Sequence, residues 1–364
     1  MSTAPSQQIK KETPEMATAF APNAADQPEA STAPAASAAE PAHPASDPRE
    51  PRTNPLIAKV GEWSRNLLAP LAGIAIFLAL WAALAPTVQT SLGALPGPIA
   101  VAEQGVALFD EWQAANELEA QFYADQETRN AAAVAAGNAA GVTDFTYSGP
   151  PTFLDQIVTS LKTVALGFLL ATLAAVPIGL VCGLSPVVNA AINPLVQIMK
   201  PVSPLAWLPI VTMVISAVVT SADPMLAKSF IISALVVMLC SLWPTLINTA
   251  VGTASIDKDL LNVGRVLKLG WFAKLTKLVL PSSLPYIFTG MRLSLGVGWM
   301  VLIAAEMLSQ NPGLGKFVWD EFQNGSSQSL ARIMFAVVVI GFIGFGLDRL
   351  MMALEALVSR NRGV

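Results

Sequence analysis

The 364-residue chain is poor in charge, histidine and cysteine. Charged residues make up 13% of it, against roughly 25% in a soluble domain. Because 53% of the residues are hydrophobic, the missing charge predicts a lipid environment. The one histidine, His43, lies in a polar region, which argues against histidine catalysis and histidine metal sites. Cys182 and Cys240 lie in apolar runs, and we interpret them as small buried residues rather than a disulfide or metal framework.

The start of the chain differs in composition from the rest. Residues 1–54 are rich in Ala, Pro, Ser and Glu and nearly lack bulky aliphatic side chains. Such a segment cannot bury enough apolar surface to offset the entropy lost on folding. It also lacks the apolar core of a secretory signal. We therefore expect residues 1–54 to form a disordered cytoplasmic tail.

Six apolar runs follow, and each is long enough to cross most or all of a bilayer. The first run has no charged residue and ends at Pro86, with Trp63 and Trp81 near its ends, as is typical of interfacial aromatic residues. We predict an all-α, polytopic transmembrane helix bundle of about six spans, or five if the third run re-enters. The runs are Leu67–Ala85, Ile157–Leu184, Val187–Val219, Phe230–Val251, Leu284–Leu308 and Ile333–Leu357.

The loops between these runs differ in charge. Residues 87–155 carry nine acidic side chains and one basic one, Arg129, which predicts a periplasmic insert. Its stretch from Ile99 to Ala136 has helical spacing, and we expect it either to dock an external partner or to pack over the bundle as a helical hairpin. Residues 252–283 carry five basic and two acidic side chains, which predicts a cytoplasmic loop. Six spans then leave both termini in the cytoplasm.

The loop between the fourth and fifth runs has the pattern of a short helix–turn–helix. Asp259 is predicted to cap its first helix and Gly270 to end that helix in a left-handed turn. A second, basic helix is predicted from Trp271, with Pro281 and Pro285 stopping it and redirecting the chain into the fifth span. Because two spans hold this loop at its ends, it has a suitable shape to transmit a push from a soluble partner.

This loop resembles the coupling loop of binding-protein-dependent ABC importer permeases. In that family the loop has Glu-Ala-Ala, then a glycine, then Leu-Pro. Here residues 262–264 stand in the first place and Lys268 in the glycine place, and Leu280-Pro281 is intact. The resemblance covers about residues 56–358 and implies a type I permease domain over residues 55–364. It assigns coupling to the ATPase to Asp259, Asn262, Val263, Gly264, Arg265, Lys268, Leu269, Gly270 and Pro281.

Other stretches resemble the nitrate, sulfonate and taurine branch of these permeases, namely residues 160–168, 201–210 and 289–299. The resemblance implies import of nitrate, nitrite or a related small anion, with cyanate or bicarbonate, and sulfonate or taurine, as open alternatives. An ATP-independent anion channel or carrier is the competing class, and it gives the loop no role. Similarity to the nitrate members in particular rests on residues 262–265, 304–308 and 313–321.

The resemblance also implies partners and a location. Two separate ABC ATPase subunits use ATP and Mg²⁺, a second copy of the permease completes the pathway as a homodimer, and a periplasmic or lipid-anchored solute-binding protein delivers the anion. The chain itself is expected to bind no cofactor, metal or nucleic acid and to have no catalytic residue. It is expected to be a multi-pass protein of the bacterial inner membrane, surrounded by lipid. Residues 313–317 are not an ATP-binding P-loop, because Phe317 follows the lysine and Gln310 replaces the leading glycine.

Ionisable side chains at membrane depth cost roughly 2.5–3.5 kcal/mol each unless they are paired or hydrated. Lys200 precedes two prolines that interrupt regular helix, and broken helices line cavities in membrane proteins. We therefore predict that Lys200 and Ser203 line the anion path, with a lysine that snorkels to the interface as the alternative. Arg292 and Glu306 are further candidates, Arg292 beside headgroups and Glu306 as a gate or the partner of a lysine.

Overall fold

The computed structural model describes residues 55–90, 93–138, 141–219 and 227–360. The tail predicted over residues 1–54 lies outside this part of the chain. The chain divides into two units, Met1–Ser64 and Arg65–Val364, and the description below concerns the second. Helices dominate it, which confirms the predicted all-α class. Its helices are α1 (Pro55–Leu84, which begins in the first unit), η1 (Ala85–Thr87), α2 (Pro98–Ala135), α3 (Phe153–Leu184), α4 (Pro186–Met199), α5 (Pro204–Val218), α6 (Lys228–Ala254), α7 (Lys258–Val266), α8 (Trp271–Lys274), η4 (Leu275–Val279), α9 (Leu280–Ser309), α10 (Leu314–Asn324) and α11 (Ser329–Arg360).

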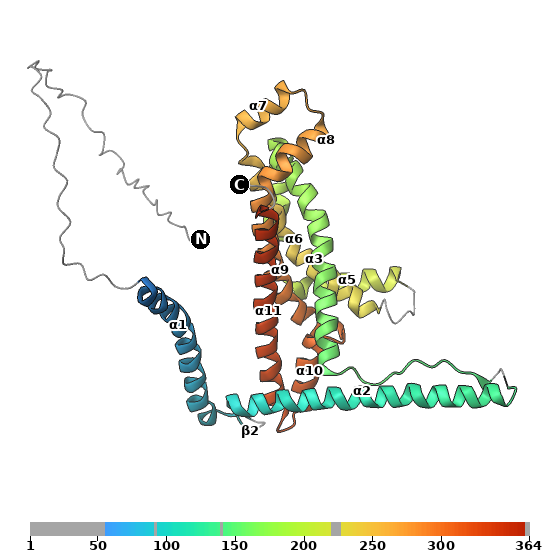
Figure 1. The fold of residues 1–364 in the computed structure, drawn as a ribbon. Coiled ribbons are helices and arrows are strands. Elements are labelled where there is room, and N and C mark those ends of the chain that lie inside the picture. Colours follow the sequence, from blue (N-terminus) through green and yellow to red (C-terminus); the bar gives the residue numbers. More distant parts are fainter. Residues whose placement is uncertain (1–54, 91–92, 139–140, 220–226, 361–364) are drawn as a thin grey trace, which may run out of the picture. The chain divides into compact units, whose positions relative to one another are not determined.

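Three long helices, α3, α6 and α9, form the centre of the bundle (Figure 1). α3 and α6 run parallel, because Gly167 lies against Val237 and Gly183 lies against Thr253, and each pair is 70 positions apart in sequence. Small residues let two helix backbones approach closely in a membrane, where lipid supplies no hydrophobic driving force between helices. Gly183 therefore makes a close contact within the chain.

α9 runs antiparallel to α6 and is joined to it by hydroxyl groups. The Thr245 hydroxyl lies 2.7 Å from that of Ser294, and the Ser233 hydroxyl lies 2.7 Å from that of Ser309. α11 packs on the outer side of α9, where the Trp299 indole N–H donates to the Ile340 carbonyl at 3.0 Å. Buried hydroxyl and indole groups thus find partners across helices, as groups away from water must.

The segment between α3 and α6 is a broken helix pair. α4 and α5 are long and apolar enough to span a membrane only when they are taken together, and the pair is bent by 101°. Because α3 and α6 point the same way, this segment has to return the chain to the side on which α3 began. The described residues hold five helices long and apolar enough to span a bilayer, or six if the bent pair is one span. The parallel packing favours the predicted count of six.

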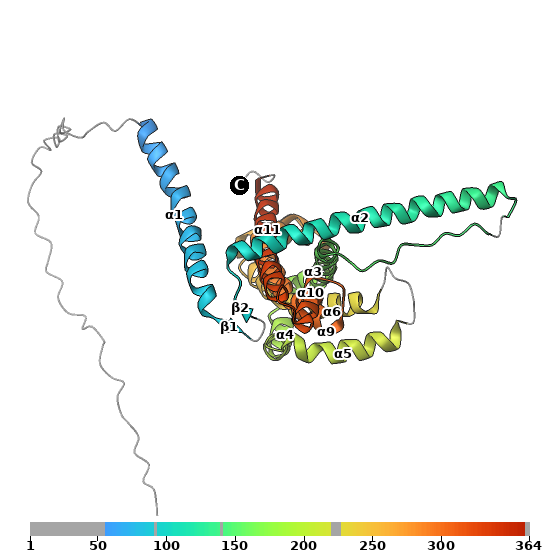
Figure 2. The ribbon, with the colours of Figure 1, turned by 90° about the horizontal axis from the view of Figure 1, so that it is seen from below.

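The segment between α1 and α3 contains a two-stranded hairpin and the long helix α2. Strands β1 (Gln89–Thr90) and β2 (Gly93–Ala94) pair antiparallel just before α2. α2 crosses the end of the bundle at which α3 and α11 begin, opposite the end that carries α7 and α8 (Figures 1 and 2). The expected helix over 99–136 is observed, but the chain returns from it in extended form, so the expected helical hairpin is wrong.

The α3–α6 contact yields a test of the packing. A Cβ on Gly179 would lie 2.6 Å from the Thr249 Cβ and 2.8 Å from the Leu246 carbonyl oxygen, which is backbone and cannot move aside. We expect Gly179→Ala to destabilise the protein by roughly 1–3 kcal/mol. Gly296→Ala is the matched control, because a Cβ there meets nothing within 4 Å. Thermal unfolding in detergent checks this, and equal midpoints for the two variants would contradict the packing.

Candidate functional site

The loop that joins α6 to α9, residues 255–281, is called the coupling loop below. The N-cap of its first helix, α7, lies two residues earlier than predicted. Asp257 is the N-cap, and its carboxylate accepts the backbone N–H of Asp259 at 2.9 Å. Asp259 itself lies in the first turn, where its charge still favours the helix dipole. The prediction that Asp259 caps the helix was therefore wrong by two residues.

The end of α7 is held by a Schellman motif. Leu269 N–H donates to the Gly264 carbonyl at 3.1 Å, and Lys268 N–H donates to the Arg265 carbonyl at 3.0 Å. This motif needs a left-handed residue just past the helix, and Lys268 takes that place with φ 49°. Gly270 has φ −62° and is the N-cap of α8, so its predicted left-handed turn was wrong. A non-glycine residue in this conformation costs about 1–2 kcal/mol.

The second half of the loop continues directly into the membrane. Residues Trp271–Ser309 form one helical segment of 39 residues, so the prediction that Pro281 and Pro285 stop the helix was wrong. Just before Pro281 lies the π-helical turn η4, in which the Leu280 N–H donates to the carbonyl five residues back. A wider turn eases the clash between a proline ring and the preceding carbonyls. The loop and α9 are therefore one mechanical unit.

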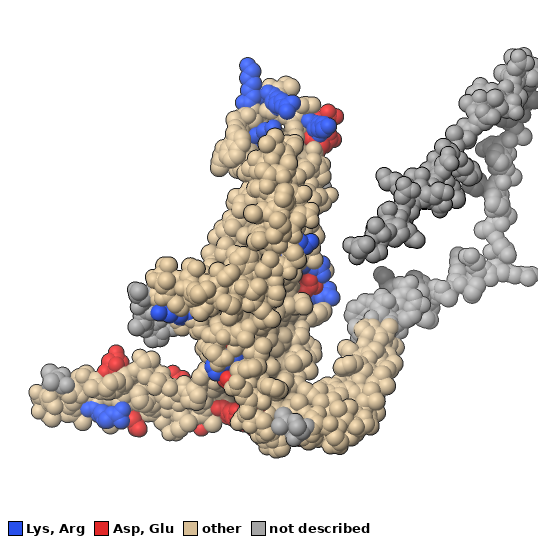
Figure 3. Space-filling model, turned by 180° about the vertical axis from the view of Figure 1, so that it is seen from behind, with Lys and Arg blue, Asp and Glu red and all other residues tan. Residues whose placement is uncertain are grey.

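The coupling loop exposes apolar and basic side chains together. Val266 is 81% exposed and Phe272 71%, although large apolar side chains gain by burial. Lysine and arginine side chains gather at this end of the bundle, with acidic side chains among them (Figure 3). An exposed apolar patch with a charged rim is typical of a protein-binding surface. Of the predicted coupling residues, the exposed ones are Asp259, Asn262, Val263, Arg265, Lys268 and Gly270, whereas Gly264 is buried and Leu269 and Pro281 are half-buried.

The predicted lining of the anion path lies at the break between α4 and α5. Lys200 is the C-cap of α4, and Ser203 is the N-cap of α5, where its hydroxyl accepts the Leu205 N–H at 3.3 Å. Both side chains are exposed. Within the described ranges, Lys200 has no carboxylate within salt-bridge distance. The break therefore presents a free cation beside a hydroxyl group.

Arg292 lies on another surface of the bundle. Its guanidinium binds Asp348 of α11 through two N–H groups, one of them at 2.9 Å. The pair joins α9 to α11 at membrane depth, where each charge alone is costly. Arg292 is thus engaged by a side chain of the same chain, which is a role the sequence did not indicate.

Glu306 lies in the last turn of α9 and is 0% exposed. The Ser160 hydroxyl of α3 lies 2.8 and 2.9 Å from its two oxygens, the Gly315 N–H donates at 3.0 Å and the Asn311 amide at 3.4 Å. Uncharged donors and the N-terminus of α10 therefore hold this carboxylate. No basic partner lies within salt-bridge distance in the part of the chain that the structure describes, so the expected lysine partner of Glu306 is not found.

The turn between α9 and α10 leaves room for this carboxylate by means of two glycines. A Cβ on Gly313 would lie 2.2 Å from the Glu306 carboxylate, and one on Gly315 would lie 2.1 Å from the Ile303 carbonyl oxygen. The Leu314 N–H also donates to the Ser160 hydroxyl at 2.8 Å. Glu306 and its donors are called the Glu306 lock below, because they fix α3, α9 and α10 to one another.

The structure does not bring the four predicted path residues together. Lys200 and Ser203 are neighbours at the α4–α5 break, Arg292 is engaged with Asp348, and Glu306 is buried among helices α3, α9 and α10. Sequence reasoning missed several partners in these contacts. Ser160 and Gly315 did fall within the stretches that carry the family resemblance, but nothing in their spacing indicated contact with a carboxylate. The missed residues are Ser160, Asp257, Asn311, Gly315 and Asp348.

A bundle with a broken span, joined rigidly to an exposed coupling loop, defines a multi-pass membrane transport subunit. The family of binding-protein-dependent transport system inner membrane components matches residues 175–360, and the chain belongs to this family. It is therefore the membrane-spanning permease subunit of an ABC importer, and ATP hydrolysis resides in separate subunits.

The relatives of this chain include permeases named for two different substrates, nitrate and bicarbonate. The chain is 38% identical over 204 residues to the nitrate import permease protein NrtB of Synechococcus elongatus, covering 56% of this chain and 69% of that one. It is 33% identical over 306 residues to the bicarbonate transport system permease protein CmpB of the same species, covering 82% and 93%. It is 37% identical over 205 residues to CmpB of a Synechocystis species, covering 56% and 68%.

The Glu306 lock yields a second prediction. Glu306→Ala leaves the Gly315 N–H and the Ser160 hydroxyl without their acceptor in a buried place, whereas the Asn311 amide keeps the Thr163 hydroxyl as an acceptor. Each lost partner costs about 1–3 kcal/mol, so we expect a loss of at least about 2 kcal/mol and a lower unfolding temperature in detergent. Glu103→Ala is the control, because that carboxylate is exposed. Equal unfolding temperatures would show that the lock contributes nothing.

Proposed function

We propose that this permease moves nitrate or nitrite into the cell across the bacterial inner membrane. The similarity to a nitrate import permease, which extends over more than half of the chain, carries the proposal. Bicarbonate is the second candidate, because the match to a bicarbonate permease covers more of both chains. Nitrate and bicarbonate are both planar, singly charged anions with three oxygens, so one pathway suits either. Sulfonates, taurine and cyanate have no such support among these relatives.

The proposed assembly follows the family. Two ATPase subunits grip the coupling loops of two permease copies, which form a homodimer, and an external binding protein delivers the anion. The basic coupling loop faces the cytoplasm together with both termini, and the acidic segment around α2 faces the periplasm. The exposed patch at Val266 and Phe272 supports docking of the ATPase, since none of the described residues covers it.

The proposed mechanism uses the rigidity of the loop–α9 unit. Closure of the ATPase dimer on ATP pushes the coupling loop, and the unbroken segment Trp271–Ser309 carries that push across the membrane. At the far end the Glu306 lock passes it to α3 and α10. Alternating access results if ATP and the loaded binding protein favour different states, because a ligand shifts an equilibrium only through unequal affinity.

We assign Lys200 and Ser203 to the anion path. A cation favours an anion electrostatically, and the break between α4 and α5 leaves backbone groups that need polar surroundings. Arg292 and Glu306 serve mainly to hold the bundle together, since each already has its partners inside the chain.

The proposal is tested by isotopic uptake in cells that carry or lack the importer, compared across nitrate, nitrite, bicarbonate, cyanate and taurine. Reversing two exposed charges of the coupling loop, Arg265→Glu with Lys268→Glu, should abolish copurification of the ATPase subunits and lower uptake at least tenfold, with membrane insertion intact. Arg129→Glu, on α2 at the opposite end of the bundle, is the control for ATPase binding and should leave copurification unchanged. Uptake that persists in the doubly reversed variant would favour an ATP-independent channel or carrier.

A variant pair tests the anion path separately. Lys200→Gln removes the cation at the α4–α5 break and should lower the maximal nitrate uptake rate roughly tenfold, as the loss of about 1.4 kcal/mol of stabilisation predicts. Lys200→Arg keeps the charge and should retain most of the activity. Both variants should still bind the ATPase subunits normally. If Lys200→Gln transports nitrate as fast as the native protein, the side chain only anchors the helix at the interface.

A further inference from the structure

The distal half of α2 forms a stiff projection, called the α2 arm here. It consists of α2 from Gln113 to Ala135 with the returning segment 141–152 laid along one face, and it extends past the bundle (Figure 2). The Asn130 side chain bonds both backbone groups of Thr143, at 2.8 and 3.0 Å. The Gln126 side chain accepts the Phe145 N–H at 2.9 Å. These bonds replace the support that the arm lacks from the bundle.

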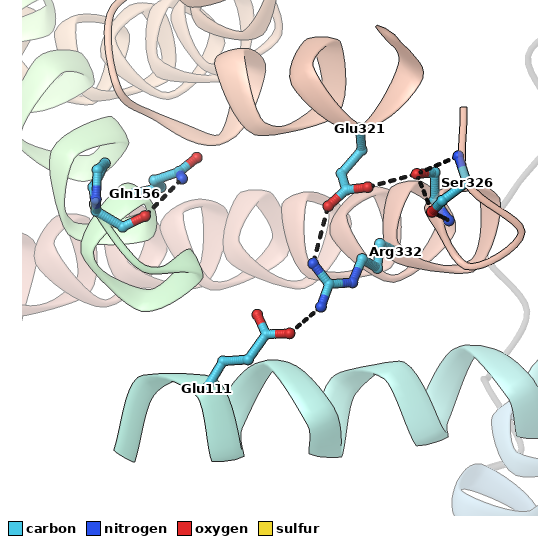
Figure 4. A network of polar contacts seen from close by, with 7 residues as sticks. Glu111, Gln156, Glu321, Ser326 and Arg332 are labelled. Atoms are coloured by element: carbon cyan, nitrogen blue, oxygen red, sulfur yellow. Dashed lines mark hydrogen bonds and ion pairs between the residues drawn. The ribbon is translucent and has the colours of Figure 1, made fainter. Parts of the chain in front are cut away.

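The arm is fixed to the bundle just before it begins. The Arg332 guanidinium at the start of α11 binds Glu111 of α2 and, at 3.1 Å, Glu321 of α10 (Figure 4). Glu321 also accepts the Ser329 hydroxyl at 2.7 Å. A planar guanidinium can hold two carboxylates on two helices at once, and a lysine cannot match that geometry. One side chain therefore joins α2, α10 and α11.

The two halves of this joint differ in strength. The Glu321 side chain is 9% exposed, whereas that of Glu111 is 53% exposed. Salt and water weaken exposed ion pairs, so the link to α2 is the weaker one. A load on the arm would therefore act first on the bond between Glu111 and Arg332.

From this joint, a series of contacts leads to the coupling loop. α10 carries Glu321 at one end, and at its other end the Gly315 N–H binds Glu306 of α9. α9 then continues without a break to Trp271 in the coupling loop. The physical connection from the arm to the ATPase side thus passes through three polar contacts and the two helices α10 and α9. The α2 arm lies outside residues 175–360, which match the family.

We propose that Arg332 is a positioning residue through which a protein docked on the α2 arm acts on α10, α9 and the coupling loop. The docked protein is the external binding protein, and in this respect the inference rests on the proposed function. Arg332 touches neither the anion nor ATP. Its role is to hold the arm at a fixed angle, so that docking energy reaches the transport helices rather than tilting the arm.

The test uses the full complex, with its ATPase subunits, reconstituted in lipid nanodiscs and titrated with anion-loaded binding protein. Glu111→Gln breaks the weak half of the joint and leaves the pair of Arg332 with Glu321 intact. Glu103→Gln is the matched control, a change of the same chemistry at an exposed position of the same helix outside the arm. We expect Glu111→Gln to raise the binding-protein concentration for half-maximal ATPase stimulation roughly two- to fivefold, with basal ATPase activity and unfolding temperature unchanged.

A double-mutant cycle sharpens the test. Arg332→Lys should give the same shift as Glu111→Gln, and the two together should give no more than either alone, because both remove one contact. If Glu111→Gln responds like Glu103→Gln, or if it lowers basal activity and stability instead, Arg332 is not a joint for docking. If the native complex shows no stimulation by any binding protein, the proposed function fails, and that outcome is distinct from equal responses of the two variants.

Discussion

The burial of one carboxylate at membrane depth is the constraint on which the transport helices depend. Glu306 is fully buried, and three donors, from α3, the turn after α9 and the start of α10, satisfy it. A charge in hydrocarbon without such donors would be too costly to keep. Each donor therefore has to stay in place whenever the helices move, and α3, α9 and α10 have to move together at this end.

This constraint gives meaning to the other end of α9. The coupling loop enters α9 through a π-helical turn and Pro281 without interrupting the helix. A push on a flexible joint would be lost as local motion, whereas a push on a continuous helix moves its far end. The strained Lys268 fits the same picture, since a fixed turn after α7 holds the docking surface at a defined angle. α9 is thus a continuous rigid helix that is joined to the coupling loop at one end and to α3 and α10 at the other.

Much of the fold could be predicted, because long uncharged runs have few alternatives to membrane helices. Local details of the loop were harder. Asp257 and Asp259 are equally good helix caps by residue type. Lys268 adopts the left-handed backbone conformation, although a glycine, Gly270, follows two positions later. Only the exact end of α7 decides between such candidates, and a pattern does not fix it. The partners of Glu306 were beyond prediction, since its α3 donor is 146 positions away.

The sparse charge of the anion path fits the division of labour in such importers. A site with several fixed cations would bind nitrate or bicarbonate tightly and release it slowly, which would limit transport. On the path that we propose, an exposed lysine followed three positions later by a serine, Lys200 and Ser203 at the α4–α5 break, would attract an anion while leaving it free to depart. Weak, shared recognition also explains how similar permeases serve two anions of the same shape and charge. Selection then has to happen before the anion reaches the membrane, at a binding protein whose engagement the permease must sense.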